Sequence, residues 1–174
     1  MSRIGKKAVT VPAGVEVKID GSNFVTVKGP KGELKGQISP LIKIEEDGAN
    51  LSFTPVNESR KASEQHGLAR TLVHNMIVGV TDGFEKKLEM IGVGYKAEKK
   101  GDTLIMQLGY SHPIEMKDPE GITTTVTSPT EITVSGPDKA QVGNYAAIIR
   151  AWRPPEQRGR AASARRNRGR SSRR

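Results

Sequence analysis

The chain has 174 residues, a formal net charge of +9 and no cysteine. Without cysteine it can form neither disulfides nor thiolate metal sites, and no apolar run approaches the roughly 20 residues that a membrane span needs. The charge is concentrated in residues 158–174, which hold eight arginines and no acidic residue, so the rest of the chain is almost neutral.

Six short segments between residues 9 and 54 have the alternating apolar pattern of half-buried strands. Polar turns separate them, and Glu46-Asp47-Gly48 is typical of a hairpin turn. The predicted strands are Val9–Val11, Val15–Ile19, Phe24–Lys28, Glu33–Ile38, Ile42–Glu46 and Asn50–Thr54. Apolar residues then recur every three or four positions from Ser59 to Val80, which predicts one amphipathic helix that ends near Gly79 and covers the first sheet.

The second half begins with another β-rich run, Phe84–Val93, which continues into Gly94–Glu98. Thr103–Leu108 is expected to pair with it across a turn, and a further hairpin is expected between residues 122 and 135. Asp138 then caps a second helix, whose apolar stripe ends before Pro154.

One stretch, Pro12–Pro30, has a near copy in Pro119–Pro137. The two align without a gap, and six of the 19 aligned pairs are identical, including the prolines and glycines at both ends. Each copy has the turn residues and the alternation of a β-hairpin, so a chance similarity of two strand–turn–strand units is the alternative. We interpret the match as an internal duplication, which predicts two similar domains.

The predicted fold class is α+β, with two duplicated domains, each an antiparallel β-sheet with one α-helix packed across it. The N-terminal domain is expected to span residues 1–81 and the C-terminal domain residues 82–157. Residues 158–174 have too little apolar surface to fold alone, so we predict a disordered, arginine-rich tail.

No motif in the sequence combines a nucleophile, a base and an orienting group, so we predict no catalytic residue and no enzymatic activity. Residues 92–97 match G-x-G-x-x-A, but a turn and a strand are expected to follow where a dinucleotide site needs a helix. His66 and His74 could share a helix face, yet no third ligand lies near them, so surface or hydrogen-bonded histidines are the simpler interpretation. We predict no metal and no cofactor.

With catalysis excluded, binding to RNA is the function that the sequence favours, because basic loops alternate with the predicted strands. The compact turn Tyr110–Pro113 offers an aromatic ring and a histidine, which can lie against an RNA bend; a plain surface turn is the alternative. Arginine forks match pairs of phosphate oxygens. The candidate RNA-binding residues are Lys86, Lys87, Lys96, Tyr110, Ser111, His112, Arg150 and Arg153 in the body, and Arg158, Arg160, Arg165, Arg166, Arg168 and Arg170 in the tail.

Three stretches resemble the large-subunit ribosomal protein six family, bacterial type L-six. They are Met1–Val15, Gly67–Glu115 (with Gly92-Val93-Gly94-Tyr95 and Gly109-Tyr110-Ser111-His112-Pro113) and Gly136–Glu156. The resemblance implies two duplicated α+β domains and a structural protein that binds large-subunit rRNA directly, near the sarcin–ricin loop and the base of the acidic stalk. It also implies neighbouring ribosomal proteins as partners, a monomer within the ribosome, and a cytoplasmic location.

The chain departs from the family pattern after Glu156. The family usually continues Pro-Tyr-Lys-Gly-Lys-Gly, whereas Gln157-Arg158-Gly159-Arg160 follows here, so the tyrosine has no counterpart. The main alternative function is a free-standing single-strand RNA-binding protein or RNA chaperone that uses the tail, and a small nucleotide-dependent enzyme is a third. The start of the chain lacks the apolar region of a signal peptide, and we expect no membrane and no small-molecule substrate as partners.

Overall fold

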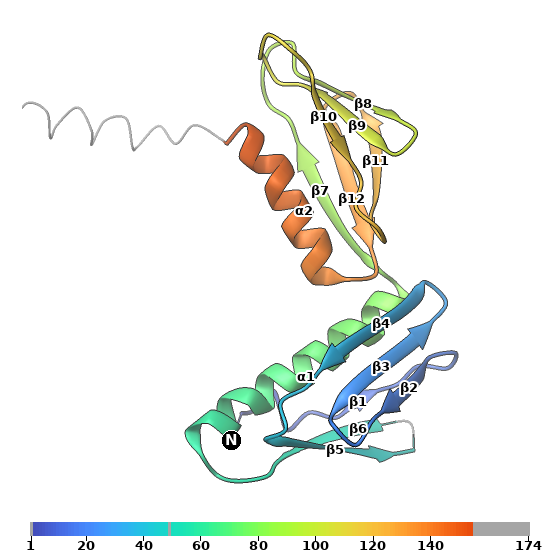
Figure 1. The fold of residues 1–174 in the computed structure, drawn as a ribbon, viewed down its shortest axis with the longest axis vertical. Helices are drawn as coiled ribbons and strands as arrows, with labels where there is room; N and C mark the ends of the chain where they lie inside the picture. The colour runs from blue at the N-terminus through green and yellow to red at the C-terminus, as the bar shows by residue number, and fades with distance from the viewer. Residues whose placement is uncertain (1, 49, 155–174) are drawn as a thin grey trace, which may run out of the picture.

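The structure is a computed structural model that describes residues 2–48 and 50–154. Among these residues, each half of the chain contains six strands and one helix (Figure 1). The first half consists of β1 (Val9–Thr10), β2 (Glu16–Ile19), β3 (Phe24–Gly29), β4 (Gly32–Gln37), β5 (Ile42–Asp47), β6 (Asn50–Pro55) and α1 (Arg60–Thr81). Its strands form two antiparallel sheets, in the orders β1-β6-β5 and β2-β3-β4.

The second half repeats this plan with its own two antiparallel sheets, in the orders β11-β12-β7 and β10-β9-β8. Its elements are β7 (Phe84–Glu89), β8 (Lys96–Lys100), β9 (Thr103–Gln107), β10 (Ile114–Lys117), β11 (Thr123–Ser128), β12 (Glu131–Gly136) and α2 (Lys139–Trp152). Each half has its own core of buried aliphatic side chains beneath its helix. The predicted fold class is confirmed for the described residues, whereas the predicted tail lies outside them.

α1 forms where the amphipathic period predicts it. Ser59 caps its first turn, because the Ser59 hydroxyl accepts a hydrogen bond from the Ala62 amide at 3.2 Å. The stripe that contains Val73 and Ile77 is buried in the first core together with the inner side chains of β3 and β6. Burying this stripe gives α1 most of its stability, since helices are only marginally stable on their own in water.

His66 lies on the buried side of α1 and is only 1% exposed. Its Nε2 lies 2.9 Å from the carbonyl oxygen of Phe53 on β6, and because a carbonyl can only accept, Nε2 carries the proton and donates. Of the two readings, surface or hydrogen-bonded, the second holds for His66. No group of three or more potential metal ligands occurs among the described residues.

The end of α1 differs from the prediction. The helix continues past Gly79 to Thr81, and Gly83, with φ +77°, takes the left-handed conformation that commonly follows a helix end. Gly79 has a different role, because a Cβ at this position would lie 2.0 Å from the Pro137 carbonyl oxygen. The glycine therefore allows the second half to approach the last turns of α1 closely.

Polar contacts surround this junction: those of Lys31 tie the end of α1 to its own half, and one of Lys139 joins the two halves. The Lys31 amide, in the turn between β3 and β4, donates to the Val80 carbonyl at 2.9 Å, and the Lys31 ammonium donates to the Asp82 carbonyl. Lys139, at the start of α2, reaches the Asn75 side-chain oxygen of α1 at 3.4 Å. The two halves thus meet through the close approach of Gly79 to Pro137 and through a hydrogen bond between the side chains of Lys139 and Asn75.

β7 is shorter than the predicted strand Phe84–Val93, since it ends at Glu89. Residues 90–95 form a loop instead, in which Gly94 has φ +77° and a Cβ at Gly92 would lie 2.5 Å from the Tyr95 ring. The continuous apolar pattern does not show this break, because the loop side chains are apolar too. The short strand β10 was also not predicted.

The duplication is confirmed by the topology, but the predicted pairing of its parts is wrong. In each half an opening strand pairs with the strand before the helix, so that Val9 lies opposite Leu51 and Leu88 opposite Ile132. The hairpin β11–β12 is therefore the counterpart of β5–β6, and the meander β8–β9–β10 is the counterpart of β2–β3–β4.

The near copy between Pro12–Pro30 and Pro119–Pro137 consequently joins two hairpins that are not equivalent in the fold. β3 and β12 both bury alternate residues against the core, and both follow a polar turn. Any hairpin with one buried face needs this alternation and this turn, so local similarity cannot tell which position in the sheet a hairpin occupies.

No helix among the described residues has the length and apolar character to cross a membrane.

Candidate nucleic-acid interface

Three segments far apart in the sequence meet at one end of the second half (Figure 1, the end of the molecule opposite α1). They are the loop 90–95 after β7, the loop 108–113 after β9, and the last turn of α2. The ring of Tyr95, at the end of the first loop, lies between Gly92 of the same loop and Gly109 of the second loop. A Cβ at Gly92 would meet the ring at 2.5 Å, and a Cβ at Gly109 would meet it at 3.4 Å. The two glycines let the loops close around this ring.

Tyr110 connects the loop 108–113 with α2. Its hydroxyl donates a hydrogen bond to the Trp152 carbonyl at 2.7 Å, and the Arg153 guanidinium lies over its ring at 5.7 Å from the centroid. Two neighbours raise the pKa of Arg153 above its usual value. The larger cause is the hydrogen bond with the Tyr110 hydroxyl, and the next is the electrostatic interaction with Tyr95. Arg153 is thus always charged and is held over an aromatic ring that is 46% exposed.

A pocket of about 560 Å³ opens beside this contact, between the start of the loop 90–95 and the end of α2. Its inner wall is apolar and includes Met90 and Tyr95. Its charged lining consists of Lys87, Arg150 and Arg153, together with the acidic residue Glu89. We call Lys87, Tyr110, Arg150 and Arg153, with the two loops, the Tyr110 surface.

The eight candidate residues of the body are not all gathered there. Lys86 and Lys87 are both exposed on β7, and of these two lysines only Lys87 lines the pocket. Lys96 is exposed at the start of β8. Ser111 and His112 are exposed in the loop 108–113. The candidate arginines of the tail lie outside the described residues; these are Arg158, Arg160, Arg165, Arg166, Arg168 and Arg170.

The sequence did not predict that two apolar residues of the loop 90–95 are exposed. Ile91 is 84% exposed and Val93 is fully exposed, although both were expected in a strand. The flanking glycines Gly92 and Gly94 were a signal for a loop, because glycine inside a strand pattern often marks a break. These side chains provide apolar contact area beside the cations of the Tyr110 surface.

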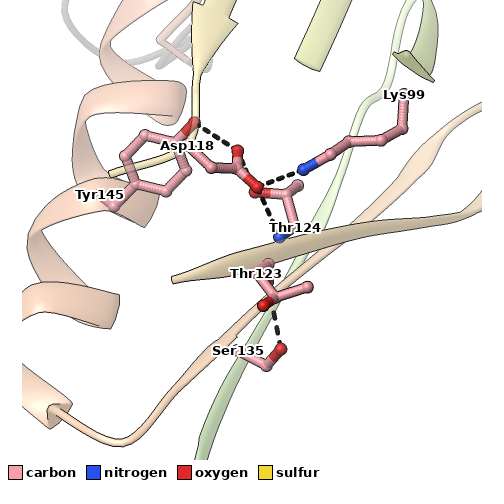
Figure 2. A network of polar contacts seen from close by, with 6 residues as sticks. All are labelled: Lys99, Asp118, Thr123, Thr124, Ser135 and Tyr145. Atoms are coloured by element: carbon pink, nitrogen blue, oxygen red, sulfur yellow. Dashed lines mark hydrogen bonds and ion pairs between the residues drawn. The ribbon is translucent and has the colours of Figure 1, made fainter. Parts of the chain in front are cut away.

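The described part of the second half also contains a polar network around Asp118, in the connection between β10 and β11 (Figure 2). Asp118 accepts hydrogen bonds from the Thr124 amide at 2.9 Å, the Thr124 hydroxyl at 2.8 Å and the Tyr145 hydroxyl at 3.1 Å. It also forms an ion pair with Lys99 of β8. The network therefore connects both sheets of the second half with α2.

Burial and charge act on this network in opposite directions. Burial by itself would raise the pKa of Asp118, but the hydrogen bonds from Lys99, Thr124 and Tyr145 outweigh it, so the pKa is lowered. Burial, followed by the charge of Asp118, raises the pKa of Tyr145 to about 12. Every partner is a fixed internal group, which indicates a structural role. No sequence motif pointed to Asp118, because its partners come from three separate elements.

The comparisons with known proteins agree on one family. The family model described as Ribosomal protein L6 matches residues 11–83 and 91–159. The chain is 55% identical over 156 residues to the large ribosomal subunit protein uL6 of Clostridioides difficile (strain 630), which covers 90% of this chain and 87% of that protein. It is 58% identical over 158 residues to the protein of the same name from Alkaliphilus oremlandii (strain OhILAs), with the same coverage.

Proposed function

The chain belongs to the ribosomal protein L6 family, and on that premise we propose that it binds large-subunit rRNA directly, through the Tyr110 surface. It is a protein of the large ribosomal subunit, so it works in the cytoplasm in association with rRNA and other ribosomal proteins. The relatives carry the names of ribosomal proteins, and we propose a structural, non-enzymatic role for this chain as well.

The observation that carries the proposal is the stacked pair of Tyr110 and Arg153 beside two further cations, Lys87 and Arg150. Guanidinium and ammonium groups bind phosphate oxygens, and an exposed aromatic ring can stack on an unpaired base. The hydrogen bond from Tyr110 to the Trp152 carbonyl fixes the ring before RNA arrives. Less conformational entropy is then lost on binding.

We further propose that the contact lies near the sarcin–ricin loop and the base of the acidic stalk, as the family resemblance implies. Ser111, His112 and Lys96 would extend it along the loop 108–113 and the start of β8, where all three are exposed. Lys86, on the opposite face of β7 from Lys87, would contact RNA only if the RNA passes around the edge of the sheet.

The proposal is tested with the variant Y110A/H112A, the matched variant Y110F, and rRNA fragments that carry the sarcin–ricin loop. Loss of one base–aromatic stack costs about 1–3 kcal/mol, so Y110A/H112A should bind the cognate fragment about tenfold more weakly or worse. Y110F keeps the ring and should lose less. Binding to scrambled RNA should change little in either variant. Equal losses on cognate and scrambled RNA would refute a specific role for this surface.

We propose that the arginine-rich segment 158–174 adds affinity with little selectivity. It has eight arginines and no aromatic residue, so it can neutralise phosphates but offers no ring for base stacking. A chain that ends at Gln157 should show a shallower salt dependence, by about 0.7–0.9 in log–log slope for each lost phosphate contact. Its affinities for cognate and scrambled rRNA should fall by similar factors. A selective loss of cognate binding at unchanged slope would contradict this assignment.

A further inference from the structure

The strand β7 has one open edge. It is the last strand of the sheet β11-β12-β7, so among the described residues only its β12 side is paired. The Met90 amide donates to the Thr130 carbonyl at 2.8 Å, and the hydrogen-bonded pairs of an antiparallel ladder recur at every second residue. The backbone groups of Leu88 therefore also point towards β12, whereas those of Lys87 and Glu89 point away from the sheet.

The open edge borders the pocket of about 560 Å³ between β7 and α2. Residues 87–91 line this pocket along the strand, and Arg150 and Arg153 line it at the end of the helix. Its apolar lining includes Met106 and Leu108, which belong to the second core. Figure 1 shows that β7 and α2 run side by side from the junction of the halves towards the far end of the second half. We call this pocket the β7–α2 groove.

The lining of the groove carries more positive than negative charge. It includes three cations, Lys87, Arg150 and Arg153, and one acidic residue, Glu89. The ion pairs among the described residues involve none of these three cations. Arginine binds carboxylates through paired hydrogen bonds. The groove therefore favours a partner that carries carboxylates.

The first half shows that the topology does not require a long open edge at this place. β1 is the counterpart of β7 and has only two residues, whereas β7 has six. Folded proteins usually keep edge strands short or covered, because an open edge pairs readily with another strand. The long edge of β7 beside an apolar groove is thus a property of the second half alone, and it is the arrangement that binds peptides by strand addition.

We propose that the β7–α2 groove binds an extended, acidic segment of another protein, which adds to β7 as a further antiparallel strand. The outward backbone groups of Lys87 and Glu89 form the hydrogen bonds, and alternate side chains of the segment enter the apolar groove. Carboxylates of the segment pair with Arg150 and Arg153. A peptide backbone supplies both the donors and the acceptors that this edge requires, whereas phosphate groups supply acceptors only.

The test uses the full chain, labelled with nitrogen-15, and the peptide acetyl-EDTVEVT-amide. Leu88 packs against the second core, so Lys87 and Glu89 direct their side chains to the opposite face of the sheet. In the proposed register the first threonine and the second glutamate of the peptide lie opposite Glu89 and Lys87, and the two valines enter the groove. The first two acidic residues then lie near Arg150 and Arg153, because the antiparallel segment starts at the end of α2.

Binding should protect the amides of Lys87 and Glu89 from hydrogen exchange, because both gain acceptors. The amides of Leu88 and Met90 point towards β12 and should change little. The matched peptide acetyl-QNTVQVT-amide has nearly the same shape but no charge. It should bind about tenfold more weakly, since hydrogen bonds between charged groups are the stronger ones.

Methylation of the peptide backbone separates strand addition from side-chain contact. Methyl groups on the nitrogens of the first threonine and the second glutamate block the edge that faces β7. This peptide should bind about tenfold more weakly, because two hydrogen bonds are lost. Methyl groups on the two valine nitrogens point away from β7 and should have a smaller effect. Equal losses would mean that side chains alone hold the peptide, and strand addition would be wrong.

Two variants test the same point from the side of the protein. E89P removes one outward amide, at an edge where proline does not interrupt the ladder with β12, and should weaken peptide binding about threefold. E89A keeps the amide and should bind the peptide at least as well as the unchanged protein. Thermal unfolding shows whether E89P remains folded. If E89P unfolds, the methylated peptides decide the question with the unchanged protein.

The inference goes beyond the proposed function, because the partner is a protein. The groove shares Lys87, Arg150 and Arg153 with the Tyr110 surface, so an rRNA fragment with the sarcin–ricin loop should displace the peptide. If the fragment binds and the peptide protects neither outward amide, the groove assignment fails and the proposed function stands. If the peptide binds and the fragment does not, only the proposed function fails. If the fragment protects both amides and the peptide does not, RNA occupies the groove and the protein partner is wrong.

Discussion

The two helices occupy equivalent places in halves of the same topology, yet different buried groups attach them to their sheets. In the first half, His66 of α1 donates one hydrogen bond to the Phe53 carbonyl of β6. In the second half, Tyr145 of α2 donates to Asp118, a charged residue that also binds Thr124 and Lys99 (Figure 2). A shared fold therefore does not require a shared polar anchor.

The comparison shows why the halves should respond differently to mutation and to pH. The hydrogen bond from His66 to the Phe53 carbonyl involves one donor and one acceptor, so its loss leaves a single group unsatisfied. A buried charge in a network leaves several groups unpaired when it is removed. In the anchor of the second half, the pKa of Asp118 is lowered and the pKa of Tyr145 is raised.

Replacing Asp118 with alanine has the largest expected effect on stability. The change leaves the Lys99 ammonium, whose side chain is only 20% exposed, without its carboxylate, and leaves the Tyr145 and Thr124 hydroxyls without their acceptor. Breaking a buried pair in this way costs about 3 kcal/mol or more in free energy of unfolding. Urea unfolding followed by the fluorescence of Trp152, the one tryptophan of the chain, reports on this half.

D118N is the matched control for that measurement. The amide has the same shape and keeps one acceptor oxygen, so its stability should lie between those of D118A and the unchanged protein. Equal stability of all three proteins would show that the Asp118 network does not hold α2 to the sheets.

Replacing His66 with alanine should cost less, about 2 kcal/mol in free energy of unfolding, because it removes one hydrogen bond and leaves a cavity beneath Gly5. The loss should appear in amide exchange of the first half while the signal of Trp152 is retained. H74A provides the control on the same helix, since His74 is only half-buried. A similar loss in H74A would mean that the effect comes from helix propensity and not from the anchor.

Gly79→Ala should have an effect whose sign depends on the second half. In an isolated fragment 1–81, alanine should stabilise α1 by up to about 1 kcal/mol, because glycine is the poorer helix former. In the full chain, the added Cβ would lie 2.0 Å from the Pro137 carbonyl oxygen, so the junction must shift and stability should fall. Thermal unfolding of both forms tests this inversion.

The same experiment tests the proposed domain boundary. If fragments 1–81 and 82–157 each show a cooperative transition, the halves are independent folding units, as the separate cores suggest. If neither fragment folds while the full chain does, the junction is part of a shared folding unit and the boundary proposal fails.

The smallest expected effect is a pH dependence that arises from the Asp118 network of the second half. The pKa of Asp118 is lowered in the folded state, so its contribution is present above the unfolded pKa and is lost as the pH falls through the folded one, below about pH 4. The pKa of Tyr145 is raised to about 12, so its contribution is complete below its ordinary pKa and is lost as the pH rises towards 12.

Denaturant titrations at several pH values check both directions. D118N should flatten the acid limb of the stability curve, and Y145F should flatten the alkaline limb. An acid limb that survives in D118N would assign it to other carboxylates.

Most elements could be predicted from the sequence, for local reasons. The period of α1 and the cap of α2, where Asp138 accepts from the Ala140 amide at 2.8 Å, depend on residues close together in the chain. The end of β7 could not be predicted in the same way. Met90 packs against the second core while Ile91 and Val93 are exposed. The run of apolar residues would look the same whether it continued as a buried strand or became an exposed loop.

The candidate site was predictable only in part. Tyr110 and Arg153 were both predicted as RNA-binding residues. The sequence near each residue does not show that they stack, since they come from different elements. The Asp118 network was missed altogether, because its members are 6, 19 and 27 residues from Asp118 along the chain. The turn before β1 was not predicted either, because its shape depends on the contact between Gly5 and His66 of α1.

The sequence was enough to predict the α+β class, the positions of nearly all strands and helices, and the separation of a near-neutral body from a basic end. These properties follow from periodicity and composition, which are local or additive. The three-dimensional arrangement of the strands was needed to show that β11–β12 corresponds to β5–β6, and that Tyr110 meets the end of α2. The reason is that one hairpin resembles another until its place in a sheet, and the helix that covers it, are known.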